Sequence, residues 1–341
     1  MSKPTTGRPR LSDVAREAGV SLGAASKALS QPDAVRQRTL TTVRRAVEKL
    51  GYIPSDSARA LASRSTRLIG IVLPTINNPV FAAFVHVLQK ELAASDYQLL
   101  ALAHEYDLAV EGTFVKRLIR RGVDGLILIG HDHDQTTIDM LEKVALPYLL
   151  TWSTDESVKR GLVGFSNRRA MHAVIDHLAA LGHRSLGVLI GETAHSERAR
   201  WRLIGIEEAA EANGMAITAV ETVPLSIDGG RAGFHHLAPL SKGITALVCA
   251  TDIVAAGALD AAKKSGVDVP RQLSITGFDD VDFAQLLTPA LTTVHIPISD
   301  MATHVSATIL AIIAHMPVPD MIELPTSLVP RESTAPALSP S

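Results

Sequence analysis

Three arginines occupy every second position in the stretch "HSERARWR" (195–202), which begins with a histidine. A guanidinium group can bind a carboxylate through two parallel hydrogen bonds. Arg198, Arg200 and Arg202, together with His195, therefore have the chemistry of an anion-binding site. Alternate residues of a helix point in different directions, so the three arginines cannot all face one ligand. We expect at least one of them to be a solvated charge and the others to favour a small anion.

The stretch "AGVSLGAASKAL" (18–29) opens like the turn of a DNA-reading motif. Gly19 can end one helix, and Ser21 can cap the next. The second helix then begins with Leu22, Gly23 and two alanines, whereas a helix that reads base edges usually carries polar side chains. Either this helix does not read DNA, or it reads DNA through few direct contacts.

Signals for catalysis, metals and cofactors are weak. The sequence "HDHD" (131–134) has metal-binding residue types, but no further ligands lie near it in sequence, so we interpret it as a polar rim. Cys249 is the single cysteine, which excludes an internal disulfide and a thiolate metal site. Phosphate-loop, GxGxxG and GxSxG patterns are absent. We therefore expect no enzyme activity, no catalytic residues, no metal and no cofactor.

Charge divides the chain into two unlike parts. Residues 1–67 contain 13 Lys/Arg and 5 Asp/Glu, a net charge of +8, and the remaining residues have a net charge of −10. A basic segment joined to an acidic body indicates a polyanion partner, although a merely solvated basic terminus has the same composition. The polar N-terminus leads into no apolar run, and no apolar stretch approaches the ~18–20 residues of a membrane span. We expect a cytoplasmic protein without membrane contact.

The length of 341 residues predicts two or three domains, and the first is all-α. Ser12 and Ser21 are candidate N-caps of its first two helices, and Gly51 is a candidate C-cap of the third. Two short helices joined by a tight turn and followed by a third form the helix-turn-helix pattern. The expected elements of this head (1–53) are a basic arm (1–10), helices over about 12–18, 22–29 and 35–50, and a loop over 30–34.

From residue 67, fully apolar strands alternate with helices. This alternation predicts an α/β body of parallel, doubly wound sheets covered on both faces. About ten strands exceed one ordinary sheet, so we predict two lobes with a ligand cleft at the carboxyl ends of the strands. The body spans 67–332, with one lobe at about 67–163 and 294–323 and the other at about 164–291 and 324–332. Expected strands are 68–74, 97–103, 124–130, 147–152, 185–191, 216–222, 246–251 and 273–278; expected helices are 79–96, 109–122, 137–144, 168–181, 198–213, 229–237 and 253–265.

Two segments flank the body. A linker over 54–66 contains one short helix (55–63), which Ser55 can cap but which is too short to be stable alone. The tail 333–341 has low complexity, and we expect it to be disordered. It has no leucine heptad, so a C-terminal coiled coil is not expected.

The order and spacing of several stretches identify a resemblance over the whole chain after the arm. The chain resembles the LacI/GalR (lactose-repressor) family of transcription regulators, whose body is similar to a periplasmic binding protein. The resemblance implies a homodimer that binds a pseudo-palindromic operator in double-stranded DNA and a small metabolite, often a sugar or sugar derivative, between the lobes. The stretches are "LSDVAREAGVS" (11–21), "VEKLGYIPSDSARAL" (47–61), "LIGIVLPTINNPVFA" (68–82), "DGLIL" (124–128), "RLIGIEEA" (202–209), "VPRQLSITGFDD" (269–280), "PALTTV" (289–294) and "LVPREST" (328–334).

On the DNA side, the resemblance places Leu22, Gly23 and Lys27 at positions that touch base edges. Lys27 can donate to guanine or phosphate, Leu22 offers an apolar contact, and Gly23 offers none. The alternative for Leu22 is packing back onto the head. Ala24 departs from the threonine that the family often has there, which removes one phosphate contact. The expected DNA-contacting residues are Ser21, Leu22, Gly23, Ser26, Lys27, Ala58, Arg59 and Leu61.

The linker helix matches the family's hinge helix. Ala58 and Leu61 match its minor-groove face, where Leu61 would wedge open the central base step. Leu61 can equally form the interface between two hinge helices. Arg59 suits phosphate or groove contact, whereas Asp56 departs from the family and faces a polyanion poorly.

In the body, the resemblance assigns Arg202 to the clamp on effector hydroxyls or carboxylate and Asp279 to the acceptor of sugar hydroxyls. Asp252 either holds a loop or touches the ligand. Trp152 either stacks on a ring or packs within a lobe, and Leu225 stands where relatives often have a stacking aromatic. The expected effector residues are Asn78, Phe81, Trp152, Arg198, Arg202, Thr251, Asp252 and Asp279.

Alternatives to an inducible repressor remain at this point. The stretch "LVGFSN" (162–167) is similar to the gluconate-responsive branch, which with the arginines favours a sugar acid. A transport-type solute-binding protein shares the body fold, but it would carry a secretion signal and lack the basic head. A member whose ligand promotes DNA binding, a co-repressor type, is not distinguished by sequence.

Overall fold

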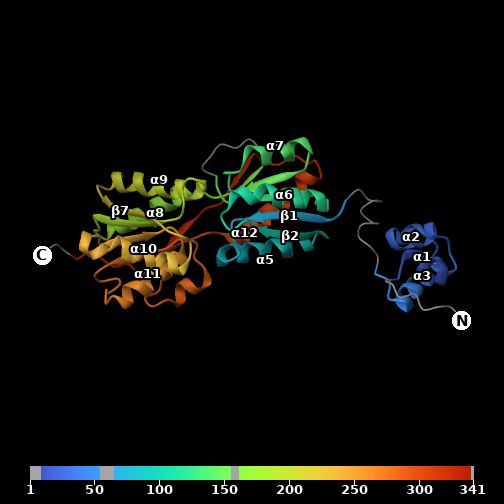
Figure 1. The fold of residues 1–341 in the computed structure, drawn as a ribbon, viewed down its shortest axis with the longest axis horizontal. Coiled ribbons are helices and arrows are strands. Elements are labelled where there is room, and N and C mark those ends of the chain that lie inside the picture. Colours follow the sequence, from blue (N-terminus) through green and yellow to red (C-terminus); the bar gives the residue numbers. More distant parts are fainter. Residues whose placement is uncertain (1–8, 54–64, 155–160, 339–341) are drawn as a thin grey trace. The chain divides into compact units, whose positions relative to one another are not determined.

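The computed structural model describes residues 9–53, 65–154 and 161–338 (Figure 1). The chain divides into two compact units, Met1–Arg67 and Leu68–Ser341. Each unit is considered by itself below.

The described part of the first unit is a three-helix head. Its helices enclose a small core of valine, leucine and alanine, in which Val14, Ala25 and Val43 are fully buried. The short turn between the first two helices confirms the helix-turn-helix pattern. The elements are α1 (Leu11–Ala18), α2 (Leu22–Ser30), the 3₁₀ turn η1 (Pro32–Ala34) and α3 (Gln37–Leu50).

The ends of these helices test the predicted caps. Ser21 caps α2 as predicted, since its Oγ accepts the Ala24 N–H at 3.1 Å. Gly51 ends α3 in the left-handed conformation, with φ of +60°. Ser12 was predicted to cap α1, and this is wrong. The helix begins one residue earlier, at Leu11, and the Asp13 carboxylate accepts the N–H of the preceding Arg10 at 2.9 Å.

The second unit has two parallel sheets, which confirms the predicted two-lobed α/β body. The first lobe has a six-stranded sheet in the order β11-β5-β4-β3-β1-β2, and the second lobe has a four-stranded sheet in the order β7-β6-β8-β9. Their central strands are buried apolar runs because helices cover both faces. The strands are β1 (Leu68–Leu73), β2 (Gln98–Ala103), β3 (Gly125–Ile129), β4 (Tyr148–Thr151), β5 (Leu162–Gly164), β6 (Ser185–Ile190), β7 (Ala216–Thr222), β8 (Ala246–Cys249), β9 (Ser274–Thr276) and β11 (Met321–Glu323).

Helices pack in pairs on the two faces of each sheet (Figure 1). In the first lobe, α5 and α12 pack together on one face, and α6 and α7 lie on the other. In the second lobe, α8 packs on α9 and α10 packs on α11. The helices are α5 (Pro79–Ala93), α6 (Leu108–Arg121), α7 (Gln135–Lys143), α8 (Asn167–Ala180), α9 (Glu197–Ala212), α10 (Ile227–Leu237), α11 (Asp252–Lys264) and α12 (Ile298–Ile313), with 3₁₀ turns η2 (Pro239–Lys242) and η3 (Asp282–Leu286).

The chain returns from the second lobe to the first near its C-terminal end. Strand β10 (Thr293–His295) pairs antiparallel with β12 (Ser327–Val329), and β11 joins the first sheet beside β5. Helix α12 and the strands β5, β10, β11 and β12 were not predicted as elements. The four strands have only three residues each, which is too short for a periodic signal.

The tail was predicted to be disordered from residue 333, and the structure corrects this. Ser333 is fully buried; its N–H donates to Ala290 O at 2.9 Å and its Oγ donates to Ile275 O at 2.6 Å. The Ala337 N–H donates to Leu181 O at 2.8 Å. These bonds to the second lobe fix the backbone as far as residue 337 despite its low-complexity composition.

Candidate functional site

A small cavity lies at the junction of the two lobes, where the carboxyl ends of the strands meet. Its volume is about 40 Å³. Seven of the eight residues predicted to bind the effector line it, and they come from both lobes. They are Asn78, Phe81, Trp152, Arg198, Arg202, Thr251 and Asp279. We call this space the inner cavity.

Asn78 and Asp279 link the lobes across the inner cavity. Asn78 caps α5, since its Oδ1 accepts the Val80 N–H at 3.2 Å. Its Nδ2 donates to Asp279 Oδ2 of the other lobe at 3.5 Å, a long hydrogen bond. A ligand that inserted between these two side chains would therefore change how the lobes meet.

The Arg202 guanidinium is held firmly in place. Its Nε donates to Asn167 Oδ1 at 2.9 Å and its Nη1 donates to Ala250 O at 2.5 Å. The group also lies over the Phe278 ring, with Cζ 3.7 Å from the ring centroid. Its Nη2 is 4.0 Å from Asp279 Oδ1. Arg202 thus presents a fixed charge beside the inner cavity, with no freedom to swing toward a distant ligand.

Asp279 occupies an unusual place for a carboxylate. Its φ of +120° is disfavoured for a residue with a side chain, a kind of strain that is concentrated at functional sites. Burial raises the pKa of Asp279 to about 7, although Arg202 and the Asn78 amide oppose the shift. At neutral pH the group can therefore be protonated or ionised, and either form can hydrogen-bond a hydroxyl.

Asp252 holds a loop and does not line the inner cavity. Its Oδ2 accepts the Val281 N–H at 2.9 Å, and its Oδ1 accepts the Thr293 hydroxyl at 2.5 Å. Of the two roles considered from sequence, the geometry supports the structural one. The neighbouring Thr251 caps α11 and reaches the inner cavity.

Trp152 is a wall of the inner cavity that is built into an aromatic cluster. It is 1% exposed, and its ring centroid lies 4.7 Å from that of Phe81 and 4.9 Å from that of Phe84. These contacts support the alternative that Trp152 packs within its lobe. Only the part of the ring that borders the inner cavity remains for a ligand.

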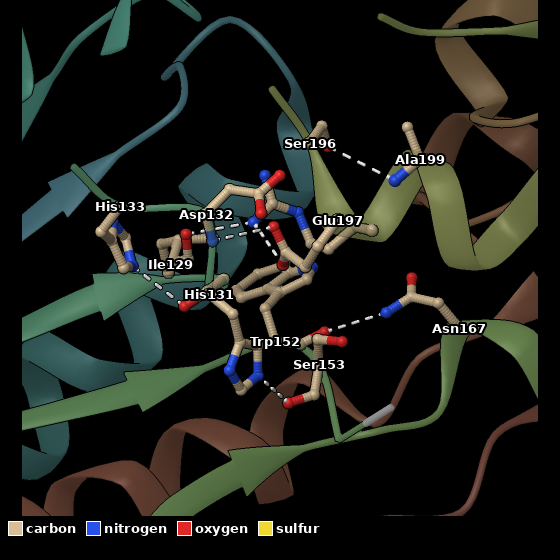
Figure 2. Close-up of polar contacts among 12 residues, drawn as sticks. Ile129, His131, Asp132, His133, Trp152, Ser153, Asn167, Ser196, Glu197 and Ala199 are labelled. Atoms are coloured by element: carbon tan, nitrogen blue, oxygen red, sulfur yellow. Dashed lines mark hydrogen bonds and ion pairs between the residues drawn. The ribbon is translucent and has the colours of Figure 1, made fainter. Parts of the chain in front are cut away.

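The other two arginines of the cluster face internal partners. Arg200 pairs with both Asp132 oxygens at 2.7 Å, across the lobes. Arg198 donates to Ile129 O at 3.1 Å and pairs with Glu197 at 3.3 Å. Figure 2 shows Asp132 and Glu197 close together in this region. Arg198 and Arg200 are therefore paired within the protein, and Arg202 is the arginine of the cluster with its charge beside the inner cavity.

The "HDHD" stretch (131–134) also uses its side chains within the protein. His131 hydrogen-bonds Ser153 O at 2.9 Å (Figure 2). His133 hydrogen-bonds Glu111 Oε1 at 2.9 Å and Gly130 O at 3.0 Å. Asp134 caps α7 through the Thr136 N–H at 2.9 Å. Within the described ranges, no group of three or more His, Cys, Asp or Glu residues is arranged to hold a metal ion. Asp132 borders the cleft, as the polar-rim interpretation requires.

A larger chamber adjoins the inner cavity and was missed from sequence. Its volume is about 560 Å³, and it shares Tyr106, Ser196 and Leu225, among others, with the inner cavity. We call it the outer chamber. Many of its residues come from the loops after β2 and β7, where neither periodicity nor a motif marks them.

In the head, α2 presents the residues expected to contact DNA. Ser21, Leu22, Gly23, Ser26 and Lys27 are all exposed, and Leu22 is 54% exposed. Leu22 therefore does not pack back onto the head. Ala25, on the opposite face, is fully buried, as predicted for a core position. The expected hinge residues Ala58, Arg59 and Leu61 lie outside the described residues.

Comparison with known proteins agrees with this division into a head and a body. Residues 10–55 match the model for bacterial regulatory proteins of the lacI family, and residues 175–334 match a periplasmic binding protein-like domain. An uncharacterized HTH-type transcriptional regulator in the aml 5' region of Streptomyces limosus is 35% identical over 320 residues, which cover 91% of this chain and 90% of the relative. The chain belongs to the lacI family of bacterial regulatory proteins. It is therefore a transcriptional regulator with a helix-turn-helix DNA-binding head.

Solved structures of lacI-family proteins share the fold of the whole chain. The lac repressor dimer bound to operator and the anti-inducer ONPF has a TM-score of 0.85, is 26% identical, and is matched over 96% of this chain and 100% of that one. A CelR–cellobiose complex has a TM-score of 0.70, is also 26% identical and is matched over the same shares. The transport-type alternative is not favoured, since the relatives are regulators with the same head. No helix within the described ranges has the length and hydropathy to cross a bilayer.

Gly23 gives a direct test of the reading helix of this lacI-family protein. A side chain added there meets nothing within 4 Å, so substitution leaves the head intact. We expect Gly23→Gln to add or alter a base preference at one operator position, because glutamine can bond a base edge. Gly23→Ala, the control, should stabilise the head by about 0.5–1 kcal/mol without changing preference. Selection from a random DNA library measures the preference, and an unchanged profile for Gly23→Gln would contradict the placement of α2.

Asp252 gives a test of the loop-holding role. Asp252→Ala leaves the Val281 N–H and the Thr293 hydroxyl buried without their acceptor, at a cost of about 1–3 kcal/mol each. Burial and the neighbouring Asp279 raise the pKa of Asp252, so the ionised form is disfavoured. Asp252→Asn keeps one acceptor and removes that charge, and we expect it to cost much less than Asp252→Ala. Urea unfolding of both variants measures the difference; equal losses would show that the two hydrogen bonds are unimportant.

Proposed function

We propose that the protein is a repressor whose affinity for operator DNA is controlled by a small sugar bound between its lobes. The observation that carries this proposal is the composition of the inner cavity. Asn78 comes from one lobe and Asp279 from the other, and they touch across it. A ligand at this place has different contacts in each arrangement of the lobes, which is the requirement for shifting a conformational equilibrium.

The polar groups around the inner cavity suit a sugar. Thr251 offers a hydroxyl, Arg202 a cationic donor, and Asp279 an acceptor that can also donate. Phe81 and Trp152 add apolar surface for the faces of a sugar ring. The CelR–cellobiose complex, which has the same fold, supports a saccharide as the ligand class.

On the DNA side we propose a homodimer on a pseudo-palindromic operator. The lac repressor was solved as a dimer bound to operator, and the present chain matches it over 96% of its length. In this proposal α2 lies in the major groove, where Lys27 and Leu22 provide direct contacts to the bases. Residues 54–66 form the hinge between the head (1–53) and the body (67–332). Leu61 would then wedge the central step of the minor groove.

Operator binding with and without sugar tests the proposal. The purified full-length protein would first select its operator from genomic fragments, and gel-shift titrations would then measure affinity. We expect a sugar to weaken operator binding by about 5–150-fold, the usual range of allosteric coupling. A sugar that strengthens binding instead would establish the co-repressor type. If no sugar changes the affinity, the proposed effector class is wrong.

A further inference from the structure

The inner cavity and the outer chamber lie next to each other. Both are lined by Tyr106, Gly191, Ser196, Arg198, Ala199 and Leu225. We propose that the outer chamber is a second saccharide subsite that selects an uncharged ring, so that the effector is a neutral oligosaccharide of at least two rings. This inference rests on the sugar effector proposed above and specifies its class.

Size is the first argument. Sites for small ligands usually have volumes of about 300–1,000 Å³. The inner cavity, at about 40 Å³, is far below this range, and the outer chamber, at about 560 Å³, lies within it. A ligand anchored by Arg202 and Asp279 therefore has to extend into the outer chamber.

Charge is the second argument. Five carboxylates line the outer chamber, and Arg198 is the only arginine or lysine among its lining residues, all of which are described. Arg198 already pairs with Glu197. An anionic group placed here would meet net negative charge, which disfavours binding. The five carboxylates are Glu105, Glu111, Asp132, Glu192 and Glu197.

The same carboxylates do not require a cationic ligand, because each already accepts a hydrogen bond or forms an ion pair within the protein. Glu105 accepts the Thr75 hydroxyl at 2.7 Å, and Glu192 accepts the Ala194 N–H at 2.9 Å. Glu111 bonds His133, while Asp132 and Glu197 pair with arginines. A carboxylate has about four lone-pair positions, so the more exposed Glu105, Asp132 and Glu192 can still accept from a ligand hydroxyl.

An unused polar atom also points to a ligand. His104 lines the outer chamber and is 7% exposed, and among the described residues its buried Nδ1 has no hydrogen-bond partner. Buried polar atoms are nearly always paired in native structures, so an orphaned one indicates a missing partner. Burial lowers the pKa of His104 and so favours the neutral ring, which adds no charge to attract an anion.

Tyr106 and Leu225 bring apolar surface to the boundary between the two spaces. They come from different lobes and line both spaces. Glu105 and Tyr106 both have positive φ, +50° and +62°, a strained backbone of the kind found at ligand sites. Tyr106 is 41% exposed. A sugar ring between Tyr106 and Leu225 would place its neighbouring ring in the outer chamber.

Matched sugars test the charge and length preference. Calorimetry on the full-length protein would compare glucose, gluconate and glucosamine with maltose, cellobiose, lactose and maltotriose. We expect at least one neutral di- or trisaccharide to bind ten-fold or more tightly than every monosaccharide, charged or not. A monosaccharide, aldonate or amino sugar that binds as tightly would overturn the subsite but keep the sugar effector. Absence of binding by every sugar would overturn both.

A variant that fills the outer chamber locates the binding. Thr222, at the end of β7, lines only the outer chamber and is exposed, so Thr222→Trp should fold normally. Val220→Trp is the control, since Val220 lies on the same exposed face of β7 and outside the lining. We expect Thr222→Trp to weaken oligosaccharide binding at least ten-fold, with sugar-free operator binding unchanged. Equal oligosaccharide affinity in the two variants would overturn the subsite.

Discussion

Arg202→Ala is expected to abolish the response to sugar while operator binding without sugar is retained. The guanidinium is fixed by Asn167, Ala250 O and the Phe278 ring, so it is already positioned before a ligand arrives. A hydrogen bond to a charged group contributes about 1.5–3 kcal/mol, which corresponds to roughly 10–150-fold in affinity. Because Arg202 is in the body and DNA contacts are in the head, operator affinity should change little. Gel-shift titration across sugar concentrations measures both quantities.

The same substitution also affects folding, so the experiment needs matched variants. Removing the guanidinium removes its hydrogen bonds to Ala250 O and Asn167 Oδ1 and its charge beside Asp279. We expect the melting temperature of the body to fall. Arg202→Lys keeps the charge but not the planar fork, and it should give an intermediate response. Arg231→Ala, a half-exposed arginine of the same lobe, is the control. A normal sugar response from folded Arg202→Ala would remove Arg202 from the site.

Much of the fold could be predicted because buried parallel strands are visible as apolar runs. The strand "LIGIVLP" was predicted to within one residue, and the helix that follows it begins at Pro79 as predicted but ends at Ala93, three residues earlier than expected. The inner cavity could be predicted because the resemblance placed Asn78, Arg202 and Asp279 on strand and helix ends. Those ends are fixed by the sheet, so the residues meet as expected.

The parts that could not be predicted depend on contacts between distant segments. At least one arginine of the cluster was expected to be a solvated charge, and the pairing of Arg200 was not predicted because its partner, Asp132, is 68 residues away in the sequence. Tyr106 was missed because its backbone is left-handed although the residue is neither glycine nor asparagine, the residue types that usually indicate this conformation. Ser333 was placed in a disordered tail because composition alone does not reveal that its hydroxyl fills a buried site in the second lobe. The local sequence pattern determines which helices and strands form. The positions of these side chains depend on contacts with residues that are distant in the sequence.

The stability of the protein should depend on pH through Asp279. Burial raises the pKa of its carboxyl group to about 7, from a usual value of 3.8. The native state therefore binds a proton that the unfolded state releases between about pH 4 and pH 7. The contribution of this group to the free energy of unfolding is fully present below the pKa of the unfolded state. It is lost as pH rises through the pKa of the native state. The full effect is on the order of 4 kcal/mol, at about 1.4 kcal/mol for each pKa unit.

Asp279→Asn should remove this dependence, because the amide is neutral at every pH. We expect wild type to lose free energy of unfolding relative to Asp279→Asn steadily as pH rises from 5 to 7, with little further change from pH 7 to pH 8. Urea unfolding at four pH values measures the difference, in which the titration of unrelated groups cancels. Asp252 keeps its own raised pKa in the variant, but without the charge of Asp279 beside it the shift becomes smaller, which adds to the same trend. Asp320→Asn, at an exposed carboxylate of the first lobe, is the control substitution. A constant difference for Asp279→Asn would mean that Arg202 keeps Asp279 ionised throughout, and that sugar hydroxyls meet a permanent carboxylate.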